Sequence, residues 1–174
     1  IVDNISTRYK DRNNTYKDIV KYIEETVRAK QGNYLVFFPS YKYMELVHEE
    51  FSERNPDIKI ILQSSSMKED EREVFLEEFN DNGETMVAFA VLGGIFSEGI
   101  DLIGDKLIGA IIVGVGLPQI CLERNIIREY FQGKNKLGYE YSYMYPGMNK
   151  VLQAAGRVIR TEEDKGIILL IDDR

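Results

Sequence analysis

Apolar residues alternate along this chain between two kinds of segment. Some segments are almost continuously apolar, which is typical of strands buried on both faces of a parallel sheet. They are residues 34–38, 58–62, 86–91, 107–113 and 167–171. In the segments between them, apolar residues recur every three or four positions, which predicts amphipathic helices. We expect these helices near residues 15–30, 44–51, 66–79, 120–132 and 148–160. The alternation predicts an α/β fold that is doubly wound, with a mostly parallel sheet and helices on both faces.

Local patterns in two of the predicted helices allow finer predictions. Ser66 and Glu69 have the spacing of a capping box, so a helix is expected to begin there. Its buried face would consist of Val74, Phe75 and Phe79. The helix at residues 120–132 would bury an apolar face made of Leu122, Ile126, Ile127 and Tyr130.

Tyrosines occupy alternate positions at 139, 141, 143 and 145. In an extended segment, all four rings would point to the same side. Such a ladder could stack nucleobases, but a hydrophobic flank packed on the domain is the more frequent arrangement. We assign no role to the connection that spans residues 120–147.

The helix predicted at residues 148–160 has a polar face of unusual composition. Gln153, Arg157 and Arg160 are spaced i, i+4 and i+7, so a helix would bring them onto one face. Apolar residues fill the opposite side: Val151, Leu152, Ala155, Val158 and Ile159. Gly156 would lie inside the helix, at a cost of roughly 1 kcal/mol relative to Ala. Two guanidinium groups beside an amide suit a polyphosphate, although a solvated basic edge is the simpler interpretation.

Composition narrows the class of protein. The chain has 174 residues, 44% of them hydrophobic, and a formal net charge of −7, which fits one globular domain and disfavours a protein that coats nucleic acid electrostatically. The single Cys121 and the single His48 exclude an internal disulfide framework and a zinc site built from several cysteines. Without an apolar run of membrane-spanning length, we expect no membrane partner and a reducing, cytoplasmic location. Because the first residue is Ile, we expect a fragment of a longer chain.

Loops at the carboxyl ends of the strands are the places where a parallel sheet gathers working residues. Three glycines between positions 93 and 99 could let backbone N–H groups approach a phosphate, while Glu98 and Asp101 could pair with an Arg or accept a ribose hydroxyl. Ser40 and Tyr41 offer a hydroxyl and a ring to nucleic acid, but taken alone they are better explained as a helix cap and a half-buried aromatic. Ser64 is similarly ambiguous.

Two further features bear on cofactors. Asp172 and Asp173 resemble an acidic metal-binding pair, but they are insufficient to assign a metal site. The sequence contains no G-x-x-x-x-G-K-[ST] loop to cradle a nucleotide's phosphates. Its arginines would therefore act on a nucleotide held by a neighbouring domain, as an arginine finger does.

Three segments in order resemble helicase motifs. Residues 35–41 (LVFFPSY), 94–101 (GIFSEGID) and 153–160 (QAAGRVIR) are similar to motifs IV, V and VI of superfamily 2 helicases. The phrases FFPSY and SEGID resemble the XPD/DinG branch, and bacterial DinG-like helicases in particular. Across residues 1–174, the chain resembles the second, C-terminal RecA-like motor domain of such an enzyme, with the N-terminal motor domain absent.

The resemblance implies a role for each matching residue. Gln153, Arg157 and Arg160 would face the γ-phosphate of ATP, which the first motor domain holds together with Mg²⁺. Glu98, Gly99, Asp101 and Gly156 would also contribute to the ATP site. Ser40, Tyr41, Ser97 and Ser64 would touch single-stranded DNA.

The resemblance also implies properties of the whole enzyme. Family members are ATP-dependent DNA helicases, and this branch generally moves 5′ to 3′. Many members carry a [4Fe–4S] cluster in the first motor domain, outside this chain. Two alternatives belong to other classes: a receiver-like binding module, and a non-catalytic nucleic-acid adaptor built on a degenerate motor domain. The receiver would carry its acidic pair after the first strand, and the adaptor would have lost the arginine motif.

Overall fold

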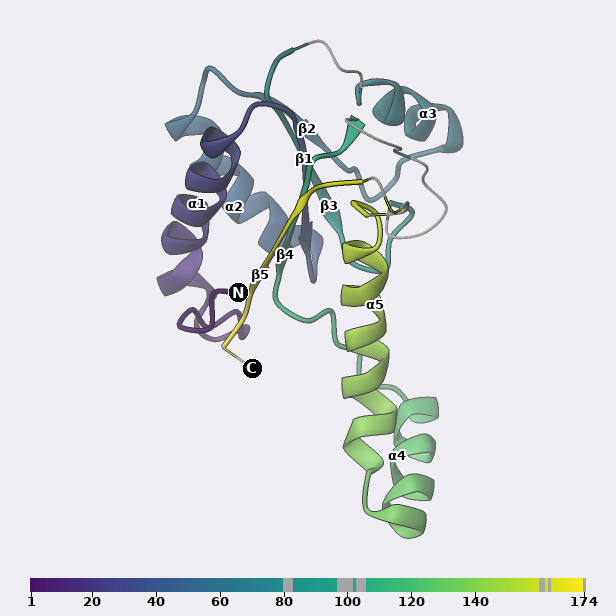
Figure 1. The fold of residues 1–174 in the computed structure, drawn as a ribbon. Coiled ribbons are helices and arrows are strands. Elements are labelled where there is room, and N and C mark those ends of the chain that lie inside the picture. The colour runs from purple at the N-terminus through teal and green to yellow at the C-terminus, as the bar shows by residue number, and fades with distance from the viewer. Residues whose placement is uncertain (80–82, 97–101, 103–105, 160–161, 163, 174) are drawn as a thin grey trace.

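The computed structural model describes residues 1–79, 83–96, 102, 106–159, 162 and 164–173. Its strands in these ranges are β1 (Asn33–Phe38), β2 (Lys59–Leu62), β3 (Met86–Val91), β4 (Gly109–Val113) and β5 (Ile167–Ile171). The helices are α1 (Arg12–Ala29), α2 (Tyr41–Arg54), α3 (Glu69–Glu77), α4 (Leu122–Asn135), the π-helix η2 (Glu140–Met144) and α5 (Tyr145–Ala155). The predicted doubly wound α/β fold is confirmed (Figure 1).

Strand β1 lies at the centre of the sheet, whose order is β2-β3-β1-β4-β5. It pairs in parallel with β3 on one side and β4 on the other. All six of its residues are buried: Val36 and Phe38 pack into the core on one face, while Leu35 and Phe37 pack into the core on the other. A strand enclosed in this way must be apolar at every position, which explains its uninterrupted apolar sequence.

Helices α1 and α2 cover one face of the sheet, and α3 and α5 cover the other (Figure 1). The first core includes Ile23 of α1 and Phe51 of α2. The second includes Phe75 of α3 and Val151 of α5. Each helix contributes the apolar stripe that its 3.6-residue period predicts.

The segment before α1 is anchored to the outer strand of the sheet. Val2 forms a parallel bridge with Ile171 of β5, and its N–H donates to the carbonyl of Leu170 at 2.8 Å. This pairing carries residues 3–11 across the end of the sheet toward the start of α1.

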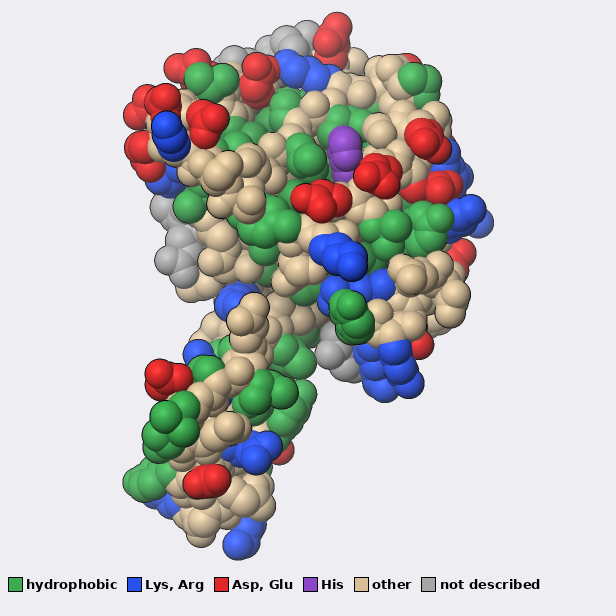
Figure 2. All heavy atoms as spheres, turned by 180° about the vertical axis from the view of Figure 1, so that it is seen from behind, with side chains coloured by type: hydrophobic (Ala, Val, Ile, Leu, Met, Phe, Trp, Pro, Cys, Tyr) green, Lys and Arg blue, Asp and Glu red, His purple; other side chains and the backbone are tan. Residues whose placement is uncertain are grey.

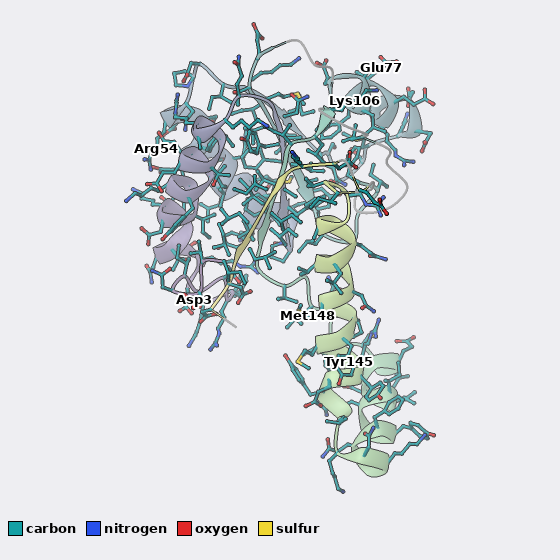
Figure 3. All side chains as sticks on the ribbon, viewed as in Figure 1. Asp3, Arg54, Glu77, Lys106, Tyr145 and Met148 are labelled. Atoms are coloured by element: carbon teal, nitrogen blue, oxygen red, sulfur yellow. The ribbon has the colours of Figure 1, made fainter. Side chains whose placement is uncertain are left out.

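Helix α4 and the continuous η2–α5 helix form a hairpin that projects from the body of the domain (Figure 1). Tyr145 and Met148 lie along its second arm, below the sheet (Figure 3). The rings of Phe131 and Tyr141 stack between the two arms with centroids 3.9 Å apart. Arg124 of α4 donates to the carbonyl of Ser142 at 3.3 Å, so ring stacking and a polar contact together join the arms.

The tyrosine segment is helical, so the extended ladder with all four rings on one side is wrong. Tyr139 contacts Tyr143 at a centroid distance of 5.7 Å, and Tyr141 contacts Tyr145 at 5.2 Å. Positions spaced by two residues also contain pairs spaced by four, which meet on a helix. The period-two pattern was therefore compatible with either conformation.

Helix α4 forms where the sequence predicts it, but its apolar face is not buried. Leu122, Ile126 and Tyr130 are 72%, 58% and 60% exposed, because α4 packs mainly on its hairpin partner, away from the sheet (Figure 1). Similarly, Val74 of α3 is 58% exposed, whereas Phe75 and Phe79 are buried as predicted.

The start of α3 differs from the predicted capping box. The helix begins at Glu69, and the backbone N–H of Lys68 donates to the Glu71 carboxylate at 2.7 Å. Ser66 instead belongs to a turn in which its N–H contacts the Ser64 hydroxyl at 3.3 Å. Only the Glu half of a capping box therefore forms, two residues further along the chain than predicted, because the ammonium group of Lys68 cannot accept a hydrogen bond.

Helix α5 begins earlier and ends earlier than predicted. It runs from Tyr145 to Ala155, so Gly156 occupies its C-cap and not its interior. After Ala155 the hydrogen bonds tighten to i→i−3, from Arg157 N to Ala154 O and from Val158 N to Ala155 O. This tighter turn keeps Val158 buried but removes Arg157 from the regular helical face. On the side predicted to be apolar and buried, Leu152 and Ile159 are exposed.

Gly109 of β4 provides a test of the packing at the sheet centre. A Cβ at this position would lie 2.6 Å from Cδ1 of Tyr34, whose ring is buried and whose hydroxyl donates to Lys30 O. We expect Gly109→Ala to lower the free energy of unfolding by about 1–3 kcal/mol through overpacking. Gly133→Ala is the matched control, because no atom lies within 4 Å of its added methyl and helix propensity would favour it by about 1 kcal/mol. Urea denaturation of both variants measures the difference, and equal stabilities would contradict the assignment.

Candidate functional site

Four loops meet at the carboxyl edge of the sheet, as the sequence predicts. The loop after β1 contains Ser40, the loop after β2 begins at Gln63, and the loops after β3 and β4 begin at Leu92 and Gly114. Backbone hydrogen bonds continue the ladder past the strand ends, from Leu92 N to Phe38 O at 2.8 Å and from Gln63 N to Phe89 O at 2.9 Å. The loops are therefore fixed relative to one another where they leave the sheet.

Gln63 links three of these elements, and sequence reasoning missed it. Its side-chain oxygen accepts the Val91 N–H at 2.8 Å, and its Nε2 donates to the Tyr41 hydroxyl at 3.0 Å. Gln63 is only 3% exposed, so both bonds are shielded from water. A polar residue directly after an apolar strand was the available signal, but only the fold shows which loops it joins.

Tyr41 is half-buried, and burial raises the pKa of its hydroxyl. Its ring packs against the first core, which is the structural alternative that the sequence left open. Because its hydroxyl accepts the hydrogen bond from Gln63, the ring is held in place at the start of α2.

Ser40 occupies the N-cap of α2, but its hydroxyl forms no capping hydrogen bond. Its backbone oxygen accepts the Met44 N–H at 3.1 Å, while its Oγ lies 3.4 Å from Nη1 of Arg12. Ser64 is exposed and its hydroxyl lies 3.2 Å from that of Ser66. Ser40 thus faces a cation, whereas Ser64 makes a local turn.

Lys150 reaches the same edge from α5. A Cβ built on Gly93 would lie 2.9 Å from Lys150 Cε, and one built on Gly116 would lie 3.5 Å from its Cδ. The Lys150 side chain therefore packs against the loops that follow β3 and β4. Gly93 has a φ of +72°, a left-handed conformation that favours glycine. This lysine was not among the site residues predicted from the sequence.

The other predicted phosphate-binding residues lie at the opposite end of α5. Gly166, which immediately precedes β5, is in contact range of Val158, so the end of α5 lies beside the amino end of β5. Gln153 is exposed there, and Arg157 Nε donates to the Gln153 carbonyl at 3.1 Å. Consequently, Gln153 and Arg157 do not join Ser40, Tyr41 and Ser64 in a single site.

Five of the predicted residues lie outside the described part of the chain. They are Ser97, Glu98, Gly99, Asp101 and Arg160. Gly156 is described: it is exposed, with a φ of −67° that any residue can adopt. A Cβ at Gly156 would lie 3.3 Å from the Leu152 carbonyl, which is close but leaves room for small adjustments.

The acidic pair at the end of β5 is occupied by the N-terminal segment. Thr7 Oγ1 donates to Asp172 at 2.8 Å, and Arg8 lies 3.6 Å from Asp173. Among the described residues, no group of three or more His, Cys, Asp or Glu side chains could hold a metal ion. Across the same residues, no helix is both long and apolar enough to span a membrane.

Comparison with known proteins identifies the family. Residues 23–174 match the helicase C-terminal domain family. The chain belongs to this family. This match and the DinG relatives confirm the resemblance of the chain to the C-terminal helicase domain of the XPD/DinG-like family.

The relatives of this helicase C-terminal domain are much longer proteins. A probable ATP-dependent helicase of Methanocaldococcus jannaschii is 27% identical over 99% of the chain, which covers 28% of that protein. The ATP-dependent DNA helicase DinG of Photobacterium profundum is 29% identical over 90% of the chain, which covers 22% of that protein. The chain therefore spans less than a third of either relative.

The fold is also that of known structures. The solved structure named XPD_APO superposes with a TM-score of 0.79 at 23% identity, over 99% of this chain and 35% of that one. At this level of identity the match supports the RecA-like α/β fold.

The Gln63 bridge of this helicase domain can be tested by removing its polar atoms while keeping its bulk. Gln63→Leu leaves the Val91 N–H and the Tyr41 hydroxyl without this buried partner, so we expect the free energy of unfolding to fall by about 1–3 kcal/mol. Gln119→Leu, at an exposed position, is the control. Tyr41→Phe should destabilise the wild-type domain more than the Gln63→Leu variant, since contacting residues are not additive. Full additivity in this chemical-denaturation cycle would contradict the bridge.

Proposed function

We propose that this chain is the second motor domain of an ATP-dependent DNA helicase that moves 5′ to 3′ on single-stranded DNA. The observation that supports the proposal is the family match, together with the separation of the predicted residues into two groups on one domain. Ser40, Tyr41 and Ser64 lie at the carboxyl edge of the sheet, whereas Gln153 and Arg157 lie at the far end of α5. A motor domain needs two separate sites, one for the DNA strand and one for the nucleotide.

The nucleotide site is proposed to be shared with the N-terminal motor domain. That domain would hold ATP and Mg²⁺, because this sequence contains no phosphate-binding loop. Arg157 and Arg160 would stabilise the charge that develops on the γ-phosphate, and Gln153 would help to orient it. Glu98, Gly99, Asp101 and Gly156 would complete this half of the site.

Arg157 is well placed for such a role at the end of α5. Its Nε is held by the carbonyl of Gln153, which fixes the guanidinium against the helix end while its charge is retained. A guanidinium anchored through Nε loses less conformational entropy when its remaining N–H groups meet phosphate oxygens. Gly156, directly before it, adds no side chain that would obstruct an approaching domain.

The single-stranded DNA would pass over the carboxyl edge of the sheet. Ser40 and Ser64 would contact the sugar–phosphate backbone through their hydroxyls, and Ser97 would do the same from the loop after β3. The Gln63 bridge would hold the loops after β1, β2 and β3 in a constant spacing along this track. Any [4Fe–4S] cluster of the whole protein would belong to the first motor domain.

Substitution of the arginines in the full-length protein tests the nucleotide half-site. We expect Arg157→Ala, and separately Arg160→Ala, to lower DNA-stimulated ATP turnover by about 10³-fold or more, the loss seen when an arginine finger is absent. Arg157→Lys should not restore turnover, because an ammonium lacks the planar fork of donors. Arg128→Ala, which removes an exposed arginine from α4, is the control. Normal turnover in the Arg157 and Arg160 variants would contradict their assignment as arginine fingers.

A second test uses the chain by itself. We expect residues 1–174 to show no ATP hydrolysis above background, since the proposed site is only half present. Adding the separately produced N-terminal motor domain should restore measurable turnover in a steady-state phosphate-release assay. Robust hydrolysis by residues 1–174 alone would overturn the shared-site proposal.

A further inference from the structure

A cavity of about 320 Å³ opens beside the carboxyl edge, between the N-terminal segment and the start of α2. Its walls include Tyr9, Lys10 and Arg12 on one side, and Ser40, Lys42 and Tyr43 on the other. The two sides come together because Val2 is bound to the end of β5, which directs the following residues across the sheet edge. No helicase motif of this chain includes the residues from Tyr9 to Arg12.

The charge of this cavity is opposite to that of the chain as a whole. Lys10, Arg12 and Lys42 line it, and no carboxylate is among its lining residues, although the chain carries a net charge of −7. Figure 2 shows lysine and arginine side chains gathered on the lower part of the body, below the histidine. A local concentration of positive charge on an acidic protein indicates an anionic ligand.

Arg12 forms the fixed wall of the cavity. Its guanidinium lies 4.3 Å from the centre of the Tyr43 ring, and its Nε donates to the Thr7 carbonyl at 3.2 Å. Its Nη1 faces the Ser40 hydroxyl at 3.4 Å. Burial raises the pKa of Tyr43 to about 12, so the ring remains neutral beneath the guanidinium. The arginine is thus oriented before any ligand arrives.

Lys10 and Lys42 are exposed at the rim, where each can swing toward a bound anion. Tyr9 is 77% exposed, and the Arg12 guanidinium lies 5.6 Å from its ring centre. An exposed ring beside cations suits a ligand that carries both a phosphate and an accessible base. Single strands present their bases in this way, whereas duplexes keep them stacked inside.

We propose that this cavity binds a backbone phosphate of single-stranded DNA, held by Lys10, Arg12 and Lys42, with Tyr9 available to stack on a neighbouring base. The proposal rests on the proposed helicase function and extends the track beyond Ser40, whose hydroxyl lines the same cavity. It adds a contact outside the three motifs and assigns a role to the segment that precedes α1.

The test uses the full-length protein and a fluorescent single-stranded oligonucleotide, with affinity measured by anisotropy across a salt series. We expect the double variant Lys10→Ala/Lys42→Ala to bind on the order of tenfold more weakly at 0.1 M salt, with a log–log salt slope shallower by about 0.7, the change expected when the contact with one single-strand phosphate is lost. Lys10→Arg/Lys42→Arg should retain the wild-type slope. Lys17→Ala/Lys21→Ala, which removes two exposed lysines of α1 that do not line the cavity, is the matched control.

The outcomes separate this inference from the proposed function. A full-length wild-type protein that fails to bind single-stranded DNA would overturn the proposed function itself. Wild-type binding with an unchanged slope in the Lys10→Ala/Lys42→Ala variant would overturn the cavity proposal alone. A fall in affinity for free ATP, with oligonucleotide binding intact, would likewise overturn it and indicate a nucleotide site. Matching thermal unfolding midpoints would confirm that the variants remain folded.

Discussion

The burial of β1 between two cores is the constraint on which the domain depends. β1 pairs with β3 and β4, and its side chains alternate between the two apolar layers, so its position is fixed on four sides. The residues that follow a strand held this firmly are also fixed. Ser40, Tyr41 and the start of α2 therefore leave the sheet at a defined place, and the Gln63 bridge sets the neighbouring loops against them.

Helix α5 runs from the carboxyl edge of the sheet to its amino edge. It passes Lys150 across the loops after β3 and β4 at the carboxyl edge, and it delivers Arg157 to the amino end of β5. A packed helix transmits displacement along its length better than a loop does, because its backbone hydrogen bonds and its buried stripe resist bending. In the proposed motor, α5 would couple the state of the nucleotide to the position of the bound DNA strand. Its extension into the α4 hairpin lengthens the same rigid element beyond the body.

The electrostatic arrangement shows why net charge is a weak guide to binding. A chain of net charge −7 still assembles a cavity lined by three cations and no carboxylates, because the N-terminal segment and α2 meet at one edge. The nearby acidic pair is engaged by Thr7 and Arg8, which places its charge against the protein itself. Distribution of charge in space, and not its sum, determines what such a surface attracts.

The sequence by itself determined the strands, the order of the elements and the doubly wound class, because uninterrupted apolar runs such as Leu35–Phe38 are typical of strands in a parallel sheet covered by helices. The runs of the edge strands β2 and β5 are only partly buried, and the sequence did not distinguish them from the central ones. It also identified Ser40 and Tyr41 at a strand end. Only the tertiary structure decided that α5 stops at Ala155, that Arg157 and Ser40 lie at opposite ends of the domain, and that Tyr9–Arg12 completes a cavity with Lys42. Periodicity reports which face of an element is apolar, but it contains no information about which distant segments meet that face. The tyrosines from 139 to 145 and the exposed side of α4 were misjudged for this reason, since a local pattern is satisfied equally by burial in a core and by a hairpin that projects from it.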